Sequence, residues 1–376
     1  MSFLTTFPED VYPTHRLAET IQTGAFDIDL AQALMWMSQA TYESTADRSR
    51  ASGDRKLERI LDRWGFACRA RLSQAGTEGF VAESAATLVV AFAGTDPVVA
   101  ANWVTDFNIR TRSGGIHRGF ADGVEGIWPA LLAALEGTDK RIFLAGHSLG
   151  GALAVVAAWR LTGDTPEAAD RRSHGEAIDV GRIAGVLTFG MPRAGDEAFE
   201  AAYRSRGLWQ KTARLEYGSD IIPSLPPAVS GQLAFRHVGP ALHCPHGGQF
   251  KDVLPPRDDP DDRIELEQLE ERLGISDTET LRSVRDAWGR ILDHGVPRSP
   301  AGGTATLIID KLPFFLRDHL QDCYLEALGW SFDRPTEARV SISADDADTF
   351  SRASEAHIEE RGGGFSALLR RLLPGG

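Results

Sequence analysis

The feature that most constrains the fold is the segment 141–161, where a short apolar run leads through a glycine-rich turn into an alanine-rich stretch. The run RIFLA (141–145) predicts a buried strand, and ALAVVAAWRL (152–161) predicts a helix. Between them, residues 146–150 read Gly-His-Ser-Leu-Gly and match G-x-S-x-G, a sharp strand-to-helix turn that exposes its serine. Because strand, turn and helix follow in the order that the motif requires, we predict that Ser148 is a nucleophile rather than part of a structural turn.

A serine hydroxyl is a weak nucleophile until a base removes its proton and hydrogen-bond donors stabilise the oxyanion that forms. In this kind of turn, one donor is the backbone N–H of the residue after the serine, here Leu149. That peptide begins a helix, where the helix dipole favours negative charge. His147 is interpreted as a packing or hydrogen-bonding neighbour whose side chain points away from the nucleophile's pocket.

Other apolar runs indicate the rest of the fold. Residues 87–93, 183–189 and 213–217 predict further strands. Residues 28–44 place apolar side chains at helical spacing, with Asp27 or Asp29 as a cap. Strands that alternate with helices favour an α/β fold with a mainly parallel central sheet flanked by helices.

The character of the sequence changes near residue 251. Residues 251–312 contain the acidic, proline-rich run LPPRDDPDDR and then two stretches with helical spacing, which predicts an inserted helical region. We expect this insertion to cap the site. Residues 1–334, insertion included, are interpreted as one domain, and 335–376 as a polar tail that ends in a short helix.

Six ordered blocks of sequence resemble the class 3 lipases, the fungal-type triacylglycerol lipase family of the α/β-hydrolase superfamily. Besides the nucleophile turn, they are VVAFAGTDPVVAANWVTDF (89–107), IHRGFADGV (116–124), LTFGMPRAGDEAF (187–199), RLEYGSDIIPSLPP (214–227) and FRHVG (235–239), with a further match near 315–328. The resemblance implies an α/β-hydrolase fold with a helical cap or lid. It also implies hydrolysis of carboxylic esters through a Ser-His-Asp triad and an acyl-enzyme, with no metal or organic cofactor.

Carried over to this sequence, the resemblance assigns Asp220 as the triad acid and His319, in RDHLQDCY, as the base. Thr95 becomes the second oxyanion-hole residue beside Leu149. The chain order Ser148, Asp220, His319 is the order of the α/β-hydrolases.

Two points stay open in this assignment. His294, in LDHGVP, is the main alternative base. The family commonly has Arg before Gly-Thr, and this chain has Ala93 there, so a polar contact that supports the oxyanion turn is missing.

By the same resemblance, the lid is roughly residues 96–108, where an acyl chain would contact apolar side chains: Val98, Val99, Trp103 and Phe107. The expected substrate is a lipid or another acyl ester. The alternatives are a phospholipase A1, an acyltransferase, or a non-catalytic scaffold that binds lipid or a partner protein.

Composition limits the binding partners and the cellular compartment that we expect for this protein. The net charge of −13 argues against nucleic acid. The run His243-Cys244-Pro245-His246 lacks a second ligand cluster, which argues against zinc. With three cysteines, no basic-then-apolar leader pattern and no long apolar run, we expect a cytoplasmic protein without a transmembrane segment. Signal-free secretion and transient contact with a lipid interface stay open, as does the oligomeric state.

Overall fold

In a computed structural model of the chain, the described residues are 6–43, 50–74, 76–94, 111–112, 114–163, 178–220, 222–226, 229–230, 233–251 and 317–332. The expected insertion lies outside them apart from Lys251, and so does the expected tail at 335–376. Both therefore stay predictions.

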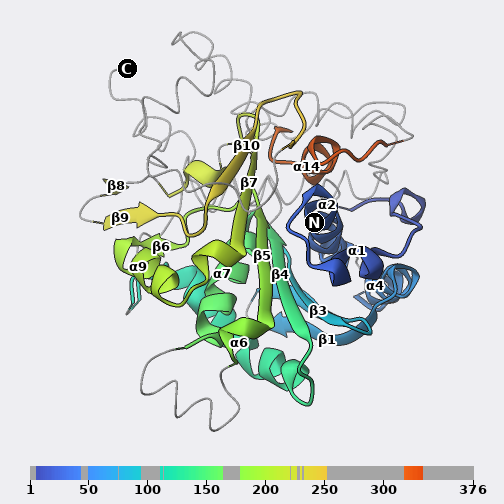
Figure 1. The fold of residues 1–376 in the computed structure, drawn as a ribbon, viewed down its shortest axis with the longest axis horizontal. Helices are drawn as coiled ribbons and strands as arrows, with labels where there is room; N and C mark the ends of the chain where they lie inside the picture. The colour runs from blue at the N-terminus through green and yellow to red at the C-terminus, as the bar shows by residue number, and fades with distance from the viewer. Residues whose placement is uncertain are drawn as a thin grey trace, which may run out of the picture.

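Among the described residues, seven strands form one central sheet in the order β1-β2-β3-β4-β5-β7-β10 (Figure 1). The strands are β1 (Ala67–Gln74), β2 (Thr77–Glu83), β3 (Thr87–Phe92), β4 (Arg141–His147), β5 (Ile183–Phe189), β7 (Thr212–Tyr217) and β10 (Ala241–Cys244). The five from β3 to β10 are parallel, and β1 and β2 continue the sheet antiparallel at one edge. The predicted strands β3, β4, β5 and β7 are confirmed.

Helices cover both faces of this sheet (Figure 1). One face carries α1 (Leu17–Thr23), α2 (Ile28–Ala40), α4 (Arg50–Trp64) and α14 (Gln321–Ala327). The other carries α6 (Arg118–Leu135), α7 (Leu149–Leu161) and α9 (Glu197–Ser205). Alternate residues of β3 supply the two cores: Val89 faces the first layer, and Val90 the second. This arrangement confirms the α/β-hydrolase fold and the mainly parallel sheet.

Shorter elements complete the part of the chain that the structure describes. They are the 3-10 helices η1 (Glu9–Val11), η2 (Val180–Arg182), η3 (Trp209–Lys211) and η4 (Ile222–Ser224), and the strands β6 (Gly195–Asp196), β8 (Val229–Ser230) and β9 (Leu233–Arg236). The three short strands form a separate small sheet in the order β6-β9-β8. Within the described ranges, no helix combines the length and the apolar character needed to cross a membrane.

Helix α2 begins where a side chain caps it and lies buried against the sheet. Asp27 accepts a hydrogen bond from the backbone N–H of Leu30 at 2.9 Å, which confirms it as the cap. Every residue from Ala33 to Ala40 is buried, because the helix packs between the sheet and the N-terminal segment. Its last turn leads into Tyr42 and Glu43, and each of these makes a polar contact inside the protein.

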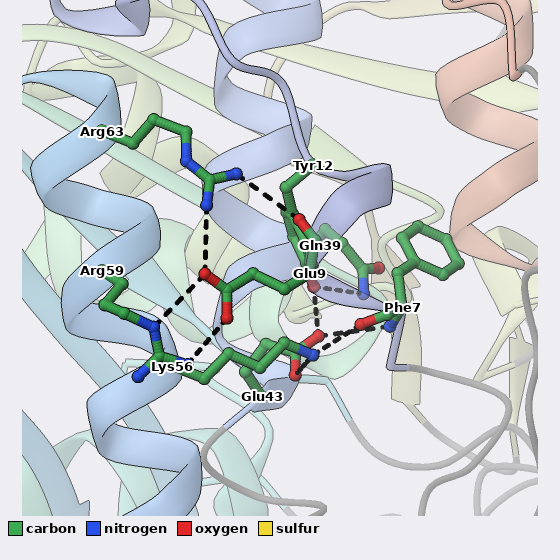
Figure 2. Close-up of polar contacts among 8 residues, drawn as sticks. All are labelled: Phe7, Glu9, Tyr12, Gln39, Glu43, Lys56, Arg59 and Arg63. Carbon is green, nitrogen blue, oxygen red and sulfur yellow. Dashed lines mark hydrogen bonds and ion pairs between the residues drawn. The ribbon is translucent and has the colours of Figure 1, made fainter.

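Glu43 is the centre of a buried polar cluster that fastens the N-terminal segment to α2 and α4 (Figure 2). Its Oε1 accepts hydrogen bonds from the backbone N–H of Phe7, at 3.2 Å, and from the hydroxyl of Tyr12. Its Oε2 lies 2.5 Å from Nζ of Lys56, on α4. The Glu43 side chain is only 3% exposed, so its carboxylate depends on these partners instead of water.

Burial raises the pKa of Glu43 above its usual 4.5, and the charge of Lys56 opposes this shift. Burial and the neighbouring carboxylate raise the pKa of Tyr12 well above its usual range, so Tyr12 stays a donor. A more exposed pair lies alongside, where Arg59 contacts Glu9 at 2.7 Å (Figure 2).

We predict that Lys56→Met lowers the free energy of unfolding by about 3 kcal/mol at neutral pH, because it leaves the Glu43 carboxylate buried without a cation. Since the pKa of Glu43 is already raised, the folded variant binds a proton more readily than the unfolded chain. The loss of unfolding free energy in Lys56→Met should therefore become smaller as the pH falls towards 4.5 and larger as the pH rises. Urea unfolding at several pH values measures it.

Arg59→Met is the matched control. Like Lys56→Met, it removes a cation from α4. The ion pair that it breaks, between Arg59 and Glu9, is more exposed, since the arginine side chain is 57% exposed. Such pairs contribute little, so its effect on stability should be far smaller. Equal losses in the two variants would contradict a special role for the buried pair.

Candidate active site

The turn between β4 and α7 holds Ser148 in a strained backbone conformation. With φ at 58° and ψ at −131°, Ser148 is the one non-glycine residue with positive φ in the described part of the chain. Its N–H donates to the carbonyl of Phe189 at 2.8 Å, and its own carbonyl accepts from Gly151 at 3.0 Å. These bonds fix the serine at the junction of strand and helix, as the motif predicts.

The glycines of this turn are required by backbone packing. A Cβ added to Gly146 would lie 2.1 Å from the carbonyl carbon of Gly150, and one added to Gly150 would lie 2.2 Å from the carbonyl oxygen of Phe92. Backbone atoms cannot rotate away as a flexible side chain can. The helix therefore approaches the sheet this closely only with glycine at both positions.

The acid and the base predicted from the sequence form a buried pair. Nδ1 of His319 lies 2.8 Å from Oδ2 of Asp220, and the two side chains are 0% and 1% exposed. A carboxylate only accepts, so Nδ1 carries the proton and Nε2 keeps its lone pair. Nε2 has no hydrogen-bond partner among the described residues, which leaves it available as a base.

Two further donors hold the Asp220 carboxylate in place. The hydroxyl of Tyr324, on α14, donates to Oδ2 at 2.6 Å, and the backbone N–H of Ile222 donates to Oδ1 at 2.9 Å. Burial, together with the charge of Asp220, raises the pKa of Tyr324 well above its usual value of 10.0. Tyr324 therefore remains a donor, and together with His319 and Ile222 it gives the carboxylate three hydrogen bonds.

Gly190 brings this pair against the backbone of the elbow at Ser148. It follows Phe189, the residue whose carbonyl accepts from Ser148, and has φ at +59°. A Cβ at this position would lie 2.5 Å from Oδ2 of Asp220 and 3.0 Å from the His319 ring. The turn after β5 thus places the acid and the base beside the elbow, and only glycine leaves room for them.

His147 contacts the base from the other side. Its Nε2 lies 2.8 Å from the carbonyl oxygen of His319, and its Nδ1 lies 2.9 Å from the hydroxyl of Tyr42. The carbonyl can only accept, so Nε2 carries the proton and Nδ1 accepts from Tyr42. Burial, and then the nearby His319, lower the pKa of His147 well below its usual 6.5. His147 is therefore neutral, and it is the hydrogen-bonding neighbour that the sequence suggests.

Several predicted site residues lie outside the described residues: Thr95, Val98, Val99, Trp103, Phe107 and His294. Gly94 is the last described residue before that stretch, and a Cβ on it would lie 2.9 Å from Cβ of Ser148. The chain that follows β3 therefore lies directly against Ser148. Leu149 is the first residue of α7, as expected.

Sequence reasoning did not single out Tyr42, Gly190 or Tyr324. Tyr324 lies in the same short block as His319, and this was the one signal available for it. His246, considered above as a zinc ligand, instead lies 2.8 Å from Oδ1 of Asp318. In the described ranges, no group of three His, Cys, Asp or Glu side chains is arranged to hold a metal ion.

Part of this chain is similar to a known protein family. Residues 89–230 match the model of the class 3 lipases. The chain is 28% identical over 194 residues to the secreted mono- and diacylglycerol lipase 1 of Fusarium solani, over 48% of this chain and 51% of that protein. It is 28% identical over 169 residues to a lipase of Rhizomucor miehei, over 42% of this chain and 41% of that protein.

The Rhizomucor miehei lipase–propeptide complex is a similar solved structure, with a TM-score of 0.44 and 21% identity over 58% of this chain and 68% of that one. The chain spans about half the length, or less, of these curated relatives. The expected cytoplasmic location is wrong on this comparison. It relied on the absence of a leader pattern, whereas the Fusarium relative is a secreted lipase and points away from the cytoplasm.

The family match includes both the elbow at Ser148 and the loop of Asp220, and His319 lies beyond its end. Over residues 89–230 and over the stretches shared with these relatives, the chain is similar to the class 3 lipases.

Proposed function

We propose that the protein hydrolyses carboxylic esters, with Ser148 as nucleophile, His319 as base and Asp220 as the residue that orients the base. The observation that carries this proposal is the buried Asp220–His319 pair. Its Nδ1–Oδ2 distance is 2.8 Å, its Nε2 has no partner in the described ranges, and it packs around Gly190 against the elbow. The same pairing supports His319 over His294 as the base.

In the proposed reaction, Nε2 of His319 takes the proton of the Ser148 hydroxyl while Oγ attacks the ester carbonyl carbon. The tetrahedral intermediate collapses, His319 gives the proton to the leaving alcohol, and an acyl-enzyme remains. Water then attacks the acyl group with the same base and releases the acid and free Ser148. Asp220 stabilises the imidazolium at each step.

The oxyanion would be stabilised by two backbone N–H groups, those of Leu149 and Thr95. The position of Leu149 at the first turn of α7 supports the first, because the helix dipole there favours negative charge. The close approach of Gly94 to Ser148 supports the second, since Thr95 is the next residue in the chain.

We propose a lipid ester as substrate, because residues 89–230 match the model of the class 3 lipases and a similar protein is named a mono- and diacylglycerol lipase. The lid residues Val98, Val99, Trp103 and Phe107 would contact the acyl chain, and the insertion 251–312 would cap the pocket. Phospholipase A1 and acyltransferase activity use the same acyl-enzyme, so the identity of the ester and of the acceptor decides among them.

We predict that Ser148→Ala abolishes both labelling by a fluorophosphonate probe and hydrolysis of nitrophenyl esters, because the probe bonds covalently to the activated hydroxyl. His319→Ala should lower kcat by about 10⁴-fold or more. Ser205→Ala removes an exposed hydroxyl and should keep full labelling. Labelling that persists in folded Ser148→Ala would contradict the assignment.

A substrate panel tests the proposed class. Diacylglycerol, triacylglycerol, phosphatidylcholine and short-chain nitrophenyl esters should be compared on the same enzyme, and hydrolysis of a glyceride should be fastest. Preferred release of the first acyl chain of phosphatidylcholine would favour the phospholipase, and transfer to an added alcohol would favour the acyltransferase.

We predict that Tyr324→Phe lowers kcat by about 10- to 100-fold, because it removes a hydrogen bond to the Asp220 carboxylate. KM should change little, since Tyr324 acts through Asp220 and not on the substrate. Tyr203→Phe is the matched control, because it removes a buried tyrosine hydroxyl on the other face of the sheet, where Tyr203 contacts Thr212 of β7. A folded Tyr324→Phe enzyme with unchanged kcat would contradict this role.

A further inference from the structure

A second buried carboxylate lies immediately beside the base. Asp318 precedes His319, and its side chain is 1% exposed. Its Oδ2 accepts the backbone N–H of Ser219 at 2.8 Å, and its Oδ1 lies 2.8 Å from Nδ1 of His246. The proposed mechanism uses none of these contacts.

The two loops that bring Asp220 and His319 together also contact each other one residue earlier in each loop. Asp220 meets His319, and the preceding residues Ser219 and Asp318 meet each other. Gly218 makes this fit possible: its φ is +57°, and a Cβ on it would lie 2.1 Å from Oδ2 of Asp318. The two loops are therefore joined at two successive positions.

His246 lies on the solvent side of Asp318, in the turn after β10. Its side chain is 69% exposed, in contrast to the buried His319. The turn is tied to the end of β7, because the N–H of Gly247 donates to the hydroxyl of Tyr217 at 2.9 Å. The histidine is thus held near Asp318 by backbone contacts that do not depend on its own charge.

Arg317, next to Asp318 in the chain, forms an ion pair with a different carboxylate. Arg317 lies 3.1 Å from Oδ1 of Asp322, on α14. The charge of Asp318 contributes to the raised pKa values of Tyr217 and Cys323, for which burial is the main cause. Among the described residues, the titratable or charged groups that contact Asp318 or His246, adjoin them in the chain, or respond to the charge of Asp318 include Tyr217, Arg317 and Cys323.

We propose that Asp318 and His246 are positioning residues for the proposed hydrolysis, a second carboxylate–imidazole pair that fixes the loop of His319 and sets the charge beside it. This inference depends on the proposed function, since it concerns the base of that reaction. The Asp318 carboxylate favours a protonated His319, and protonated His246 cancels that influence.

The test follows the rate of fluorophosphonate labelling of Ser148 against pH in the full chain, because labelling needs neutral His319 and no knowledge of the substrate. His246→Ala leaves Asp318 without its cation, so the midpoint of the acid limb should rise by about one pH unit. Asp318→Asn keeps an acceptor for Ser219 but removes the charge, so its midpoint should fall. The double variant removes both charges and should return close to the wild-type midpoint.

His246→Lys restores a cation and should also keep the wild-type midpoint. Midpoints that do not move, or that move in the same direction in His246→Ala and Asp318→Asn, would overturn the proposal. If Asp318→Asn does not fold, the exposed His246→Ala decides alone, and an unchanged midpoint there rejects the pair. A wild-type chain that is not labelled at all, or is labelled elsewhere than at Ser148, would instead reject the proposed function.

Discussion

The close contact between α7 and the strands β3 and β4 is the constraint on which the rest of the site depends. Gly150 lies against the carbonyl of Phe92, and Gly146 lies against Gly150, so backbone meets backbone without intervening side chains. This contact leaves Ser148 at a positive φ that costs about 1–3 kcal/mol. The apolar layers on both faces of the sheet must supply that stability, and they do so around strands that are buried along nearly their full length.

Loops from distant parts of the chain meet at this rigid turn, and polar contacts hold each of them. Asp220 follows β7, His319 precedes α14, and Tyr324 on α14 reaches back to the same carboxylate. Helix α2 adds a link from the opposite side, because Tyr42 contacts His147 while its neighbour Glu43 is held by Tyr12 and Lys56. The N-terminal segment and the elbow are thus connected through two successive residues at the end of one helix.

The sequence predicts the elements that are determined by residues adjacent in the chain. The strands β3, β4, β5 and β7 are continuous apolar runs, and the elbow is recognisable because its glycines have no substitute. The strand β1 was not predicted, since ACRARLSQ is a half-exposed edge strand rich in polar residues. The highly charged helix α4 was missed for a similar reason, because only a narrow stripe of it is apolar.

Long-range polar contacts were beyond sequence reasoning alone. No local sequence pattern links Tyr42 to its partner His147, because the two are far apart in the chain. The same holds for Asp318 and His246. Asp220 and His319 were named through family resemblance, because spacing cannot show that residues 99 positions apart share a hydrogen bond.

The neutral state of His147 has a consequence for the path of the proton. The ring lies 4.5 Å from that of His319, close enough for a neighbouring base to compete for a proton. Yet its Nδ1 is occupied by Tyr42, and burial holds its pKa well below the usual value. In the proposed reaction, a proton that reaches His319 therefore has no second basic site behind it in the elbow. His147 therefore does not take up the proton of the His319 imidazolium.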